Sequence, residues 1–100
     1  MNNKEKLLNL LGLAQRAGRV ISGEELVIKA IQSGQVGLVF LADDAGSNLT
    51  KAVTDKSNYY KVEVFAVFST LELSTAIGKP RKVLAITDAG FIKKMRTLMD

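Results

Sequence analysis

The chain has 100 residues and a formal net charge of +4, and 47% of its residues are hydrophobic. This length and hydrophobic content predict one domain, residues 1–100, with a core of its own. The sequence contains no cysteine and no histidine, which excludes disulfides, thiolate nucleophiles, zinc sites and a Ser-His-acid triad. The excess of basic residues favours a polyanionic partner.

The leucines near the N-terminus predict neither a targeting signal nor a membrane segment. They lie between residues 7 and 13, where Asn9 and Gly12 interrupt them, and Gln15 and Arg16 follow. No small-residue cleavage pattern comes after them, and no apolar run approaches the length needed to cross a bilayer. We therefore expect a cytoplasmic protein with no membrane partner.

Helical and strand-like segments alternate along the whole chain, as judged from the spacing of apolar residues. Five helices are expected, over residues 4–17, 23–33, about 47–57, 69–77 and from 88 onward, with strands over 19–22, 38–42, 62–67 and 83–87. The continuous apolar runs at 38–42 and 83–87 are typical of strands that are covered on both faces. This order predicts a three-layer α/β/α sandwich around a mixed, mostly parallel sheet of about four strands.

Residues with strong helix-end preferences flank the expected helices. Gly18 and Gly34 are placed to end the first two helices, and Ser47 is a candidate N-cap of the third. The run Ser69-Thr70-Leu71-Glu72 has the spacing of a capping box. Asp88 is the expected cap of the last helix.

The first candidate site combines the start of the second helix with a basic loop. Unpaired N–H groups and a partial positive charge gather at a helix start, where phosphate can dock. A glycine there allows RNA to approach the main chain closely, lysine and arginine contact phosphates, and an acid can accept from an exposed guanine edge. The predicted RNA-binding residues are Ser22, Gly23, Glu24, Glu25 and Lys29, together with Lys79, Pro80, Arg81 and Lys82 on the loop.

The same residues also have a purely structural interpretation. Ser-Gly-Glu-Glu is an ordinary helix start, because acids are favoured in the first turn. Glu25 and Lys29 are spaced i, i+4 in the favourable order and can pair with each other. The basic residues of the loop 78–82 are compatible with an ordinary solvated turn.

The second candidate site is acidic. Asp43 and Asp44 follow one buried strand and Asp88 follows another, and carboxylates at strand ends can hold Mg²⁺ or support phosphoryl transfer in α/β folds. The structural alternative, which we favour, is that Asp44 belongs to a turn and Asp88 caps a helix. The sequence has no Walker-type phosphate loop.

Two long stretches of the chain resemble the kink-turn-binding ribosomal proteins of the L7Ae type. The first runs from Gly23 through Lys29-Ala30 and Gly34 to residues 38–45, and the second covers residues 73–88. The resemblance is closest to the small bacterial, YlxQ-type members, in residues 10–14, 20–24 and 53–62. It implies a three-layer α/β/α fold and binding to a sharply bent RNA internal loop with tandem sheared G·A pairs.

The resemblance also implies where base recognition differs in this chain. The family's Gly-x-Asn-Glu-x-x-Lys keeps its glycine and lysine as Gly23 and Lys29, whereas its Asn position is Glu25 and its Glu position is Leu26. Leu26 cannot accept a hydrogen bond from a guanine. It can make an apolar contact, or it can widen the apolar face of the helix beside Ala30. The family often has an acid where this chain has Gly46, and its basic residue on the second RNA loop is retained as Arg81. Base recognition is therefore expected to be weakened or shifted.

The function predicted from these observations is that of a non-enzymatic, monomeric RNA-binding protein associated with the ribosome or with translation. Its expected partner is a structured RNA with a kink-turn-like internal loop, with ribosomal RNA among the candidates, and no cofactor or metal is expected. The chief alternative is a protein-interaction module that keeps the fold and has lost the RNA, because an acid beside Leu26 suits a protein contact. A Mg²⁺-dependent phosphoryl-transfer domain built on Asp43, Asp44 and Asp88 is the weaker alternative.

Overall fold

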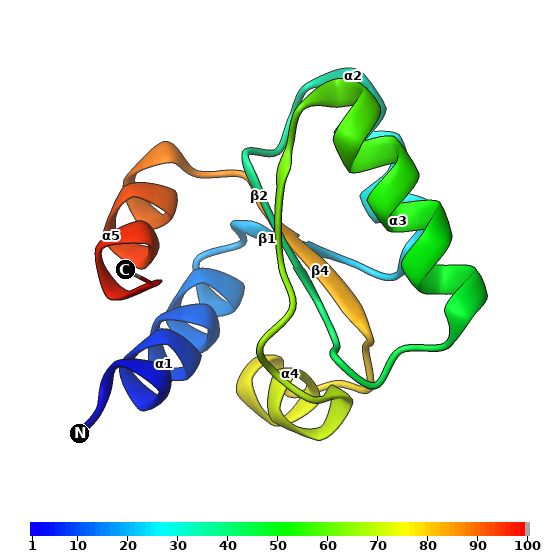
Figure 1. The fold of residues 1–100 in the computed structure, drawn as a ribbon. Coiled ribbons are helices and arrows are strands. Elements are labelled where there is room, and N and C mark those ends of the chain that lie inside the picture. The colour runs from blue at the N-terminus through cyan, green and yellow to red at the C-terminus, as the bar shows by residue number, and fades with distance from the viewer. Residues whose placement is uncertain (100) are drawn as a thin grey trace.

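A four-stranded sheet separates two layers of helices in the computed structural model, which describes residues 1–99 (Figure 1). Helices α2 and α3 cover one face of the sheet, and α1, α4 and α5 cover the other. The predicted three-layer sandwich is therefore confirmed. The elements are α1 (Asn3–Arg16), β1 (Val20–Ser22), α2 (Glu24–Ser33), β2 (Leu38–Leu41), α3 (Ser47–Tyr60), β3 (Glu63–Phe65), α4 (Thr70–Ile77), β4 (Val83–Ile86) and α5 (Ala89–Met99).

The strand directions differ from the prediction. The strand order is β1-β4-β2-β3, and β4 runs antiparallel to both of its neighbours, β1 and β2. Only β2 and β3, among the strands of residues 1–99, form a parallel pair. The expectation of a mostly parallel sheet was wrong, because alternation of strands and helices along a chain does not fix the direction in which each strand enters the sheet.

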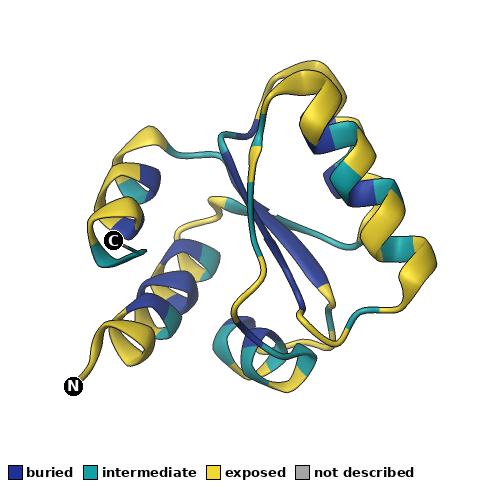
Figure 2. Ribbon diagram, in the orientation of Figure 1, coloured by how far each residue is buried: buried dark blue, intermediate teal, exposed yellow. Residues whose placement is uncertain are grey.

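The two central strands carry the core on both faces. In β2, Leu38 and Phe40 face α1, α4 and α5, whereas Val39 and Leu41 face α2 and α3. Residues of β4 alternate in the same way, and all eight residues of the two strands are buried (Figure 2). Successive side chains of a strand point to opposite faces, so a strand between two helical layers is apolar throughout. The continuous apolar runs in the sequence were therefore interpreted correctly.

Most of the predicted helix ends are confirmed. Ser69 and Glu72 form the capping box of α4, and Asp88 accepts a hydrogen bond from the backbone N–H of Phe91 at 2.9 Å at the start of α5. Gly34 ends α2 in a left-handed conformation. Gly18, which also has a positive φ, follows the C-cap residue Ala17 of α1.

Ser47 is not the N-cap of α3. The N-cap is Gly46, whose carbonyl accepts from the N–H of Thr50 at 3.0 Å, and no side chain caps this helix. Ser47 is already helical, so its hydroxyl does not face the free N–H groups of the first turn. At the other end, α3 continues to Tyr60, three residues beyond the predicted end at 57.

The third strand is shorter than predicted. Pairing of β3 with β2 stops at the pair Phe40↔Phe65, and residues 66 and 67, which were expected to extend the strand, are exposed. Because β3 is an edge strand, only β2 holds it, and the chain then turns toward α4. Among residues 1–99, no helix is long and apolar enough to cross a membrane.

Candidate nucleic-acid interface

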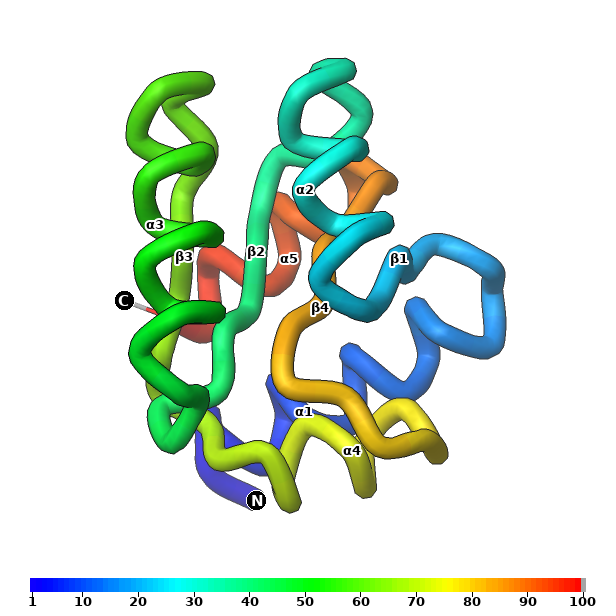
Figure 3. The backbone as a smooth tube through the Cα atoms, turned by 90° about the vertical axis from the view of Figure 1, so that its right-hand side faces the viewer, coloured from blue at the N-terminus to red at the C-terminus, as the bar shows by residue number. Residues whose placement is uncertain are grey.

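The antiparallel pairing of β1 with β4 brings the two parts of the predicted RNA site together. Ser22 at the end of β1 pairs with Leu84 near the start of β4, and the N–H of Gly23 donates to the carbonyl of Val83 at 3.1 Å. In Figure 3 the turn from β1 into α2 lies beside the beginning of β4. The loop of residues 78–82 leads into that end of β4, so it lies next to the start of α2.

Gly23 has a backbone conformation that other residues rarely adopt. Its φ is 95° and its ψ is 148°, which falls in a region reached almost only by glycine. Gly23 is also the N-cap of α2 and provides no side-chain cap. The first-turn N–H groups of α2 therefore have no capping side chain, and an anion is a suitable partner for them.

Arg81 lies against the turn at Gly23. Its Nε donates to Ser22 Oγ at 3.2 Å, and its Nη1 donates to the carbonyl of Pro80 at 2.8 Å. A Cβ built on Gly23 would be 3.8 Å from Arg81 Nε. Ser22, Gly23 and Arg81 therefore form one contiguous surface, in which Arg81 is half-buried and its guanidinium is oriented by these two hydrogen bonds.

Glu25 and Lys29 form the ion pair that the structural alternative predicted. Lys29 Nζ is 3.4 Å from Glu25 Oε1, and both side chains are largely exposed. An exposed i, i+4 pair is weak, so it does not prevent Lys29 from contacting a phosphate. Glu24 lines the same shallow hollow of α2 as this pair.

Leu26 does not widen the apolar face of α2. Its exposed fraction is 59%, whereas Val27 and Ala30 on the inner side of the helix are buried. A step of one residue rotates a side chain by about 100° around a helix, which places Leu26 outside the buried stripe, in the first turn of α2. The position to which the sequence resemblance assigned a glutamate therefore carries an exposed leucine.

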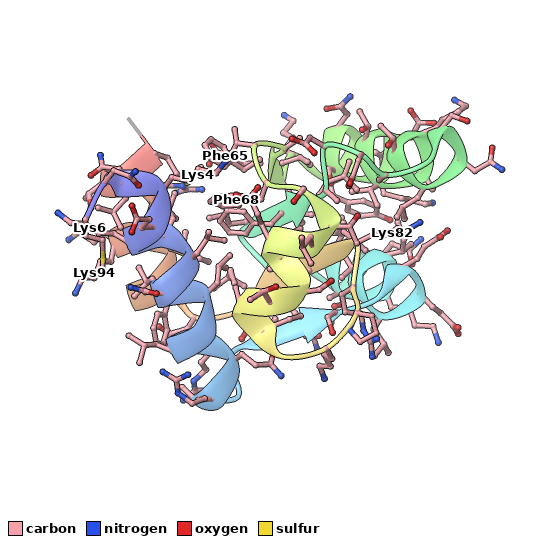
Figure 4. All side chains as sticks on the ribbon, turned by 90° about the horizontal axis from the view of Figure 1, so that it is seen from below. Lys4, Lys6, Phe65, Phe68, Lys82 and Lys94 are labelled. Carbon is pink, nitrogen blue, oxygen red and sulfur yellow. The ribbon has the colours of Figure 1, made fainter. Side chains whose placement is uncertain are left out.

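The remaining loop residues, Lys79, Pro80 and Lys82, are all exposed. Figure 4 shows Lys82 beside the loop that follows α4, on the side of the molecule that carries α2. Lys4, Lys6 and Lys94 gather on the opposite side, near α1 and α5, and Lys4 Nζ lies 5.7 Å from the centre of the Phe68 ring. The lysines labelled in Figure 4 thus lie in two separate places, Lys82 near α2 and the other three near α1 and α5.

Sequence reasoning missed Ser74, whose hydroxyl forms two hydrogen bonds with the backbone of Arg81. A serine within an amphipathic helix carries no local signal of such a role, because its partner is seven residues further along the chain.

The acidic candidate site does not form. Asp43 and Asp44 follow the end of β2, and Asp88 follows the end of β4. Because β2 and β4 are antiparallel, the C-terminal end of β2 and the C-terminal end of β4 point in opposite directions along the sheet. Asp43 and Asp44 therefore lie far from Asp88. No group of three or more potential acidic ligands within residues 1–99 could hold a metal ion.

Asp44 has a structural partner instead. Its Oδ1 accepts from the hydroxyl of Thr70 at 2.6 Å and from the N–H of Thr70 at 2.9 Å. These two hydrogen bonds, first the hydroxyl and then the N–H, lower the pKa of Asp44, because they favour the ionised carboxylate. The carboxylate therefore ties the loop after β2 to the first turn of α4.

Residues 5–96 match the family described as "Ribosomal protein L7Ae/L30e/S12e/Gadd45". The chain belongs to this family. An "RNA-binding protein YlxQ" of Enterococcus faecium is 50% identical over 98 residues, which are 98% of this chain and 95% of that protein. A protein of the same name from Bacillus subtilis is 53% identical over 92 residues, which are 91% of this chain and 92% of that protein.

A solved structure with high similarity supports the arrangement of the elements. It is the structure of a protein of unknown function from Bacillus halodurans C, with a TM-score of 0.89 and 47% identity. The superposition covers 95% of this chain and 97% of that structure. The family resemblance expected from the sequence, including its bacterial YlxQ-type branch, is thus confirmed.

Proposed function

We propose that this protein is a non-enzymatic RNA-binding protein that binds a bent, kink-turn-like internal loop through the start of α2 and the loop of residues 78–82. The protein acts as a monomer on a structured RNA, and ribosomal RNA is a candidate partner. Two of its relatives carry RNA binding in their names, and the family is a ribosomal protein family.

The observation that carries the proposal is the position of the Arg81 guanidinium over the glycine turn. The guanidinium offers a fixed cation at the place where a nucleic-acid backbone can approach the main chain of Gly23. The N–H groups of the first turn of α2 and the exposed side chains of Lys29, Lys79 and Lys82 supply further phosphate partners. The two parts of this surface, the start of α2 and the loop of residues 78–82, lie about 60 positions apart in the sequence.

Docking and base recognition rest on different residues of this surface. Gly23, Lys29 and Arg81 suit contact with backbone phosphates, whereas Glu25 and Leu26 occupy the two positions to which the family resemblance assigns base recognition. A bidentate base contact is worth roughly 1–3 kcal/mol of discrimination, and Leu26 cannot make one. We therefore propose a bent RNA as the partner, with base preferences that differ from those of the Asn-Glu motif.

A competition experiment tests the proposal. A labelled kink-turn RNA bound to the protein is challenged with an unlabelled duplex of equal length, and separately with the same RNA whose G·A pairs are replaced by Watson–Crick pairs. The kink-turn RNA is expected to outcompete both at moderate salt. Equal affinity for all three would contradict recognition of a bent RNA and leave only charge-driven binding.

The exposed Leu26 beside Glu25 favours a second candidate function, a protein-interaction module. The two candidates differ in what a pull-down from lysate retains. A specific protein partner that survives ribonuclease treatment, together with no preference for the kink-turn RNA, would support the protein-interaction module. Loss of all specific partners on ribonuclease treatment supports RNA binding.

A further inference from the structure

The loop that carries Arg81 begins by closing onto a single residue of α4. The backbone carbonyl of Ser74 accepts from the N–H of Gly78 at 2.9 Å and from the N–H of Lys79 at 3.2 Å. Gly78 has a φ of 80° and forms the left-handed C-cap of α4, which turns the chain back toward the helix. The first two residues of the loop are therefore held by the main chain of Ser74.

The end of the loop returns to the same residue. The N–H of Arg81 donates to Ser74 Oγ at 3.0 Å, and Ser74 Oγ donates to the carbonyl of Arg81 at 3.1 Å. A serine in a helix ordinarily bonds back to its own helix or to water. Here the half-buried hydroxyl satisfies both backbone groups of a residue seven positions ahead, so the loop forms a ring that closes on Ser74.

The side chain of Arg81 continues this chain of contacts to the RNA-facing turn. With its backbone held by Ser74, its guanidinium donates to Ser22 Oγ and to the carbonyl of Pro80. The contacts run from α4 through the loop to β1, and all of them are within the protein itself. The loop therefore loses conformational freedom when the protein folds. Less conformational entropy is then lost on RNA binding than for a loop without these contacts.

We propose that Ser74 is a positioning residue for RNA recognition, which acts on RNA only by holding Arg81 in place. This inference rests on the proposed function, because Arg81 must contact RNA for its position to matter. Ser74 is neutral and is held between α4 and the loop, so its effect on binding passes through Arg81.

A double-mutant cycle with the kink-turn RNA tests the proposal, using Ser74→Ala, Arg81→Ala and the combined variant. Ser74→Ala is expected to weaken binding about fivefold to tenfold, as loss of a neutral hydrogen bond does. In the Arg81→Ala background the same change is expected to alter affinity by less than about twofold, because the group that Ser74 positions is already gone. A full effect of Ser74→Ala in that background would overturn the proposal.

Two further variants separate positioning from folding. Ser74→Thr keeps the hydroxyl and is expected to restore affinity. Thr75→Ala changes the neighbouring exposed residue of the same helix and is expected to leave affinity unchanged. Loss of affinity in Thr75→Ala equal to that in Ser74→Ala would indicate damage to α4 in general and would overturn the proposal.

Hydrogen exchange in the free protein gives a measurement that does not depend on RNA. The Arg81 amide is expected to exchange at least about tenfold faster in Ser74→Ala than in the wild type, with the amides of the sheet unchanged. If the wild type fails to prefer the kink-turn RNA, the proposed function fails, and the exchange result still decides whether Ser74 orders the loop. If RNA binds and Arg81→Ala weakens it while Ser74→Ala has no effect, the proposed function stands and the role of Ser74 is overturned.

Discussion

Gly23 is the residue whose backbone conformation restricts substitution most strongly at the proposed RNA surface. Its φ of 95° with a ψ of 148° strains any residue with a Cβ by roughly 1–3 kcal/mol. The added Cβ would also stand 3.8 Å from Arg81 Nε, within van der Waals contact. The glycine therefore serves both the fold and the access of RNA to the main chain.

Gly23→Ala is expected to lower the free energy of unfolding by about 1–3 kcal/mol and to weaken RNA binding as well. Gly34→Ala is the matched control, because Gly34 ends the same helix with a φ of 76° and a Cβ added there would have open space around it. Urea unfolding and RNA titration of both variants give the two quantities. If Gly34→Ala weakens RNA binding as much as Gly23→Ala does, the loss reflects stability alone and Gly23 has no place in the RNA surface.

Lys29→Ala is expected to weaken binding across RNA sequences and to lower the slope of log K against log salt by about one unit, because one phosphate contact is lost. Lys51 provides a control, since it forms a similar exposed i, i+4 pair with Asp55 on α3, at 2.9 Å. Lys51→Ala should leave the slope unchanged. An unchanged slope in Lys29→Ala would mean that Lys29 only pairs with Glu25.

The contact between the loop after β2 and the start of α4 shows how one carboxylate joins two elements. Asp44 accepts two hydrogen bonds from Thr70, which lower its pKa below the ordinary value of about 4. The pKa of Glu72 in the capping box is lowered as well, first by the N–H of Ser69 and then by Lys4. A carboxyl whose pKa is lower in the folded state stabilises the fold above its unfolded pKa, and this contribution is lost as the pH falls through the folded pKa.

Stability is therefore expected to be level near neutral pH and to fall as the pH drops below about 4. Asp44→Asn should reduce stability near pH 7, where the charged acceptor matters, and the difference from the wild type should shrink as the pH falls through the lowered pKa of Asp44 and its carboxylate is protonated. Thermal unfolding across this range measures the effect. Asp43→Asn is the control, because no hydrogen bond to the Asp43 side chain is seen within residues 1–99; an equal loss in both variants would exclude a specific Asp44–Thr70 contact.

Local signals in the sequence predicted the elements and most helix ends, because capping boxes, glycine ends and apolar periodicity act over a few residues. Strand direction was not predictable in the same way. The pairing of Val20–Ser22 with Val83–Ile86 joins segments more than 60 positions apart, and no residue near either strand specifies it. Ser47 shows the limit of local capping signals, since Gly46 begins the helix instead.

The antiparallel direction of β4 explains why one candidate site forms and the other does not. Arg81, just before β4, lies beside the end of β1, and this proximity forms the proposed RNA surface. Asp88, just after β4, lies away from Asp43 and Asp44, so no acidic site forms. Gly23 and Arg81 were predicted as separate members of a site from residue type and family resemblance. Their direct apposition and the part played by Ser74 depend on the tertiary fold and were not predictable from the sequence.

The central claim, that RNA docks where α2 begins and the loop of residues 78–82 ends, is tested most directly by mapping amide chemical shifts during titration with a kink-turn RNA. The account predicts that the largest changes fall on residues 22–25, on Lys29 and on residues 79–82, with little change along α3 and α5. Changes centred on Lys4, Lys6 and Lys94, which lie together near α1 and α5, would contradict it, as would the absence of any localised change.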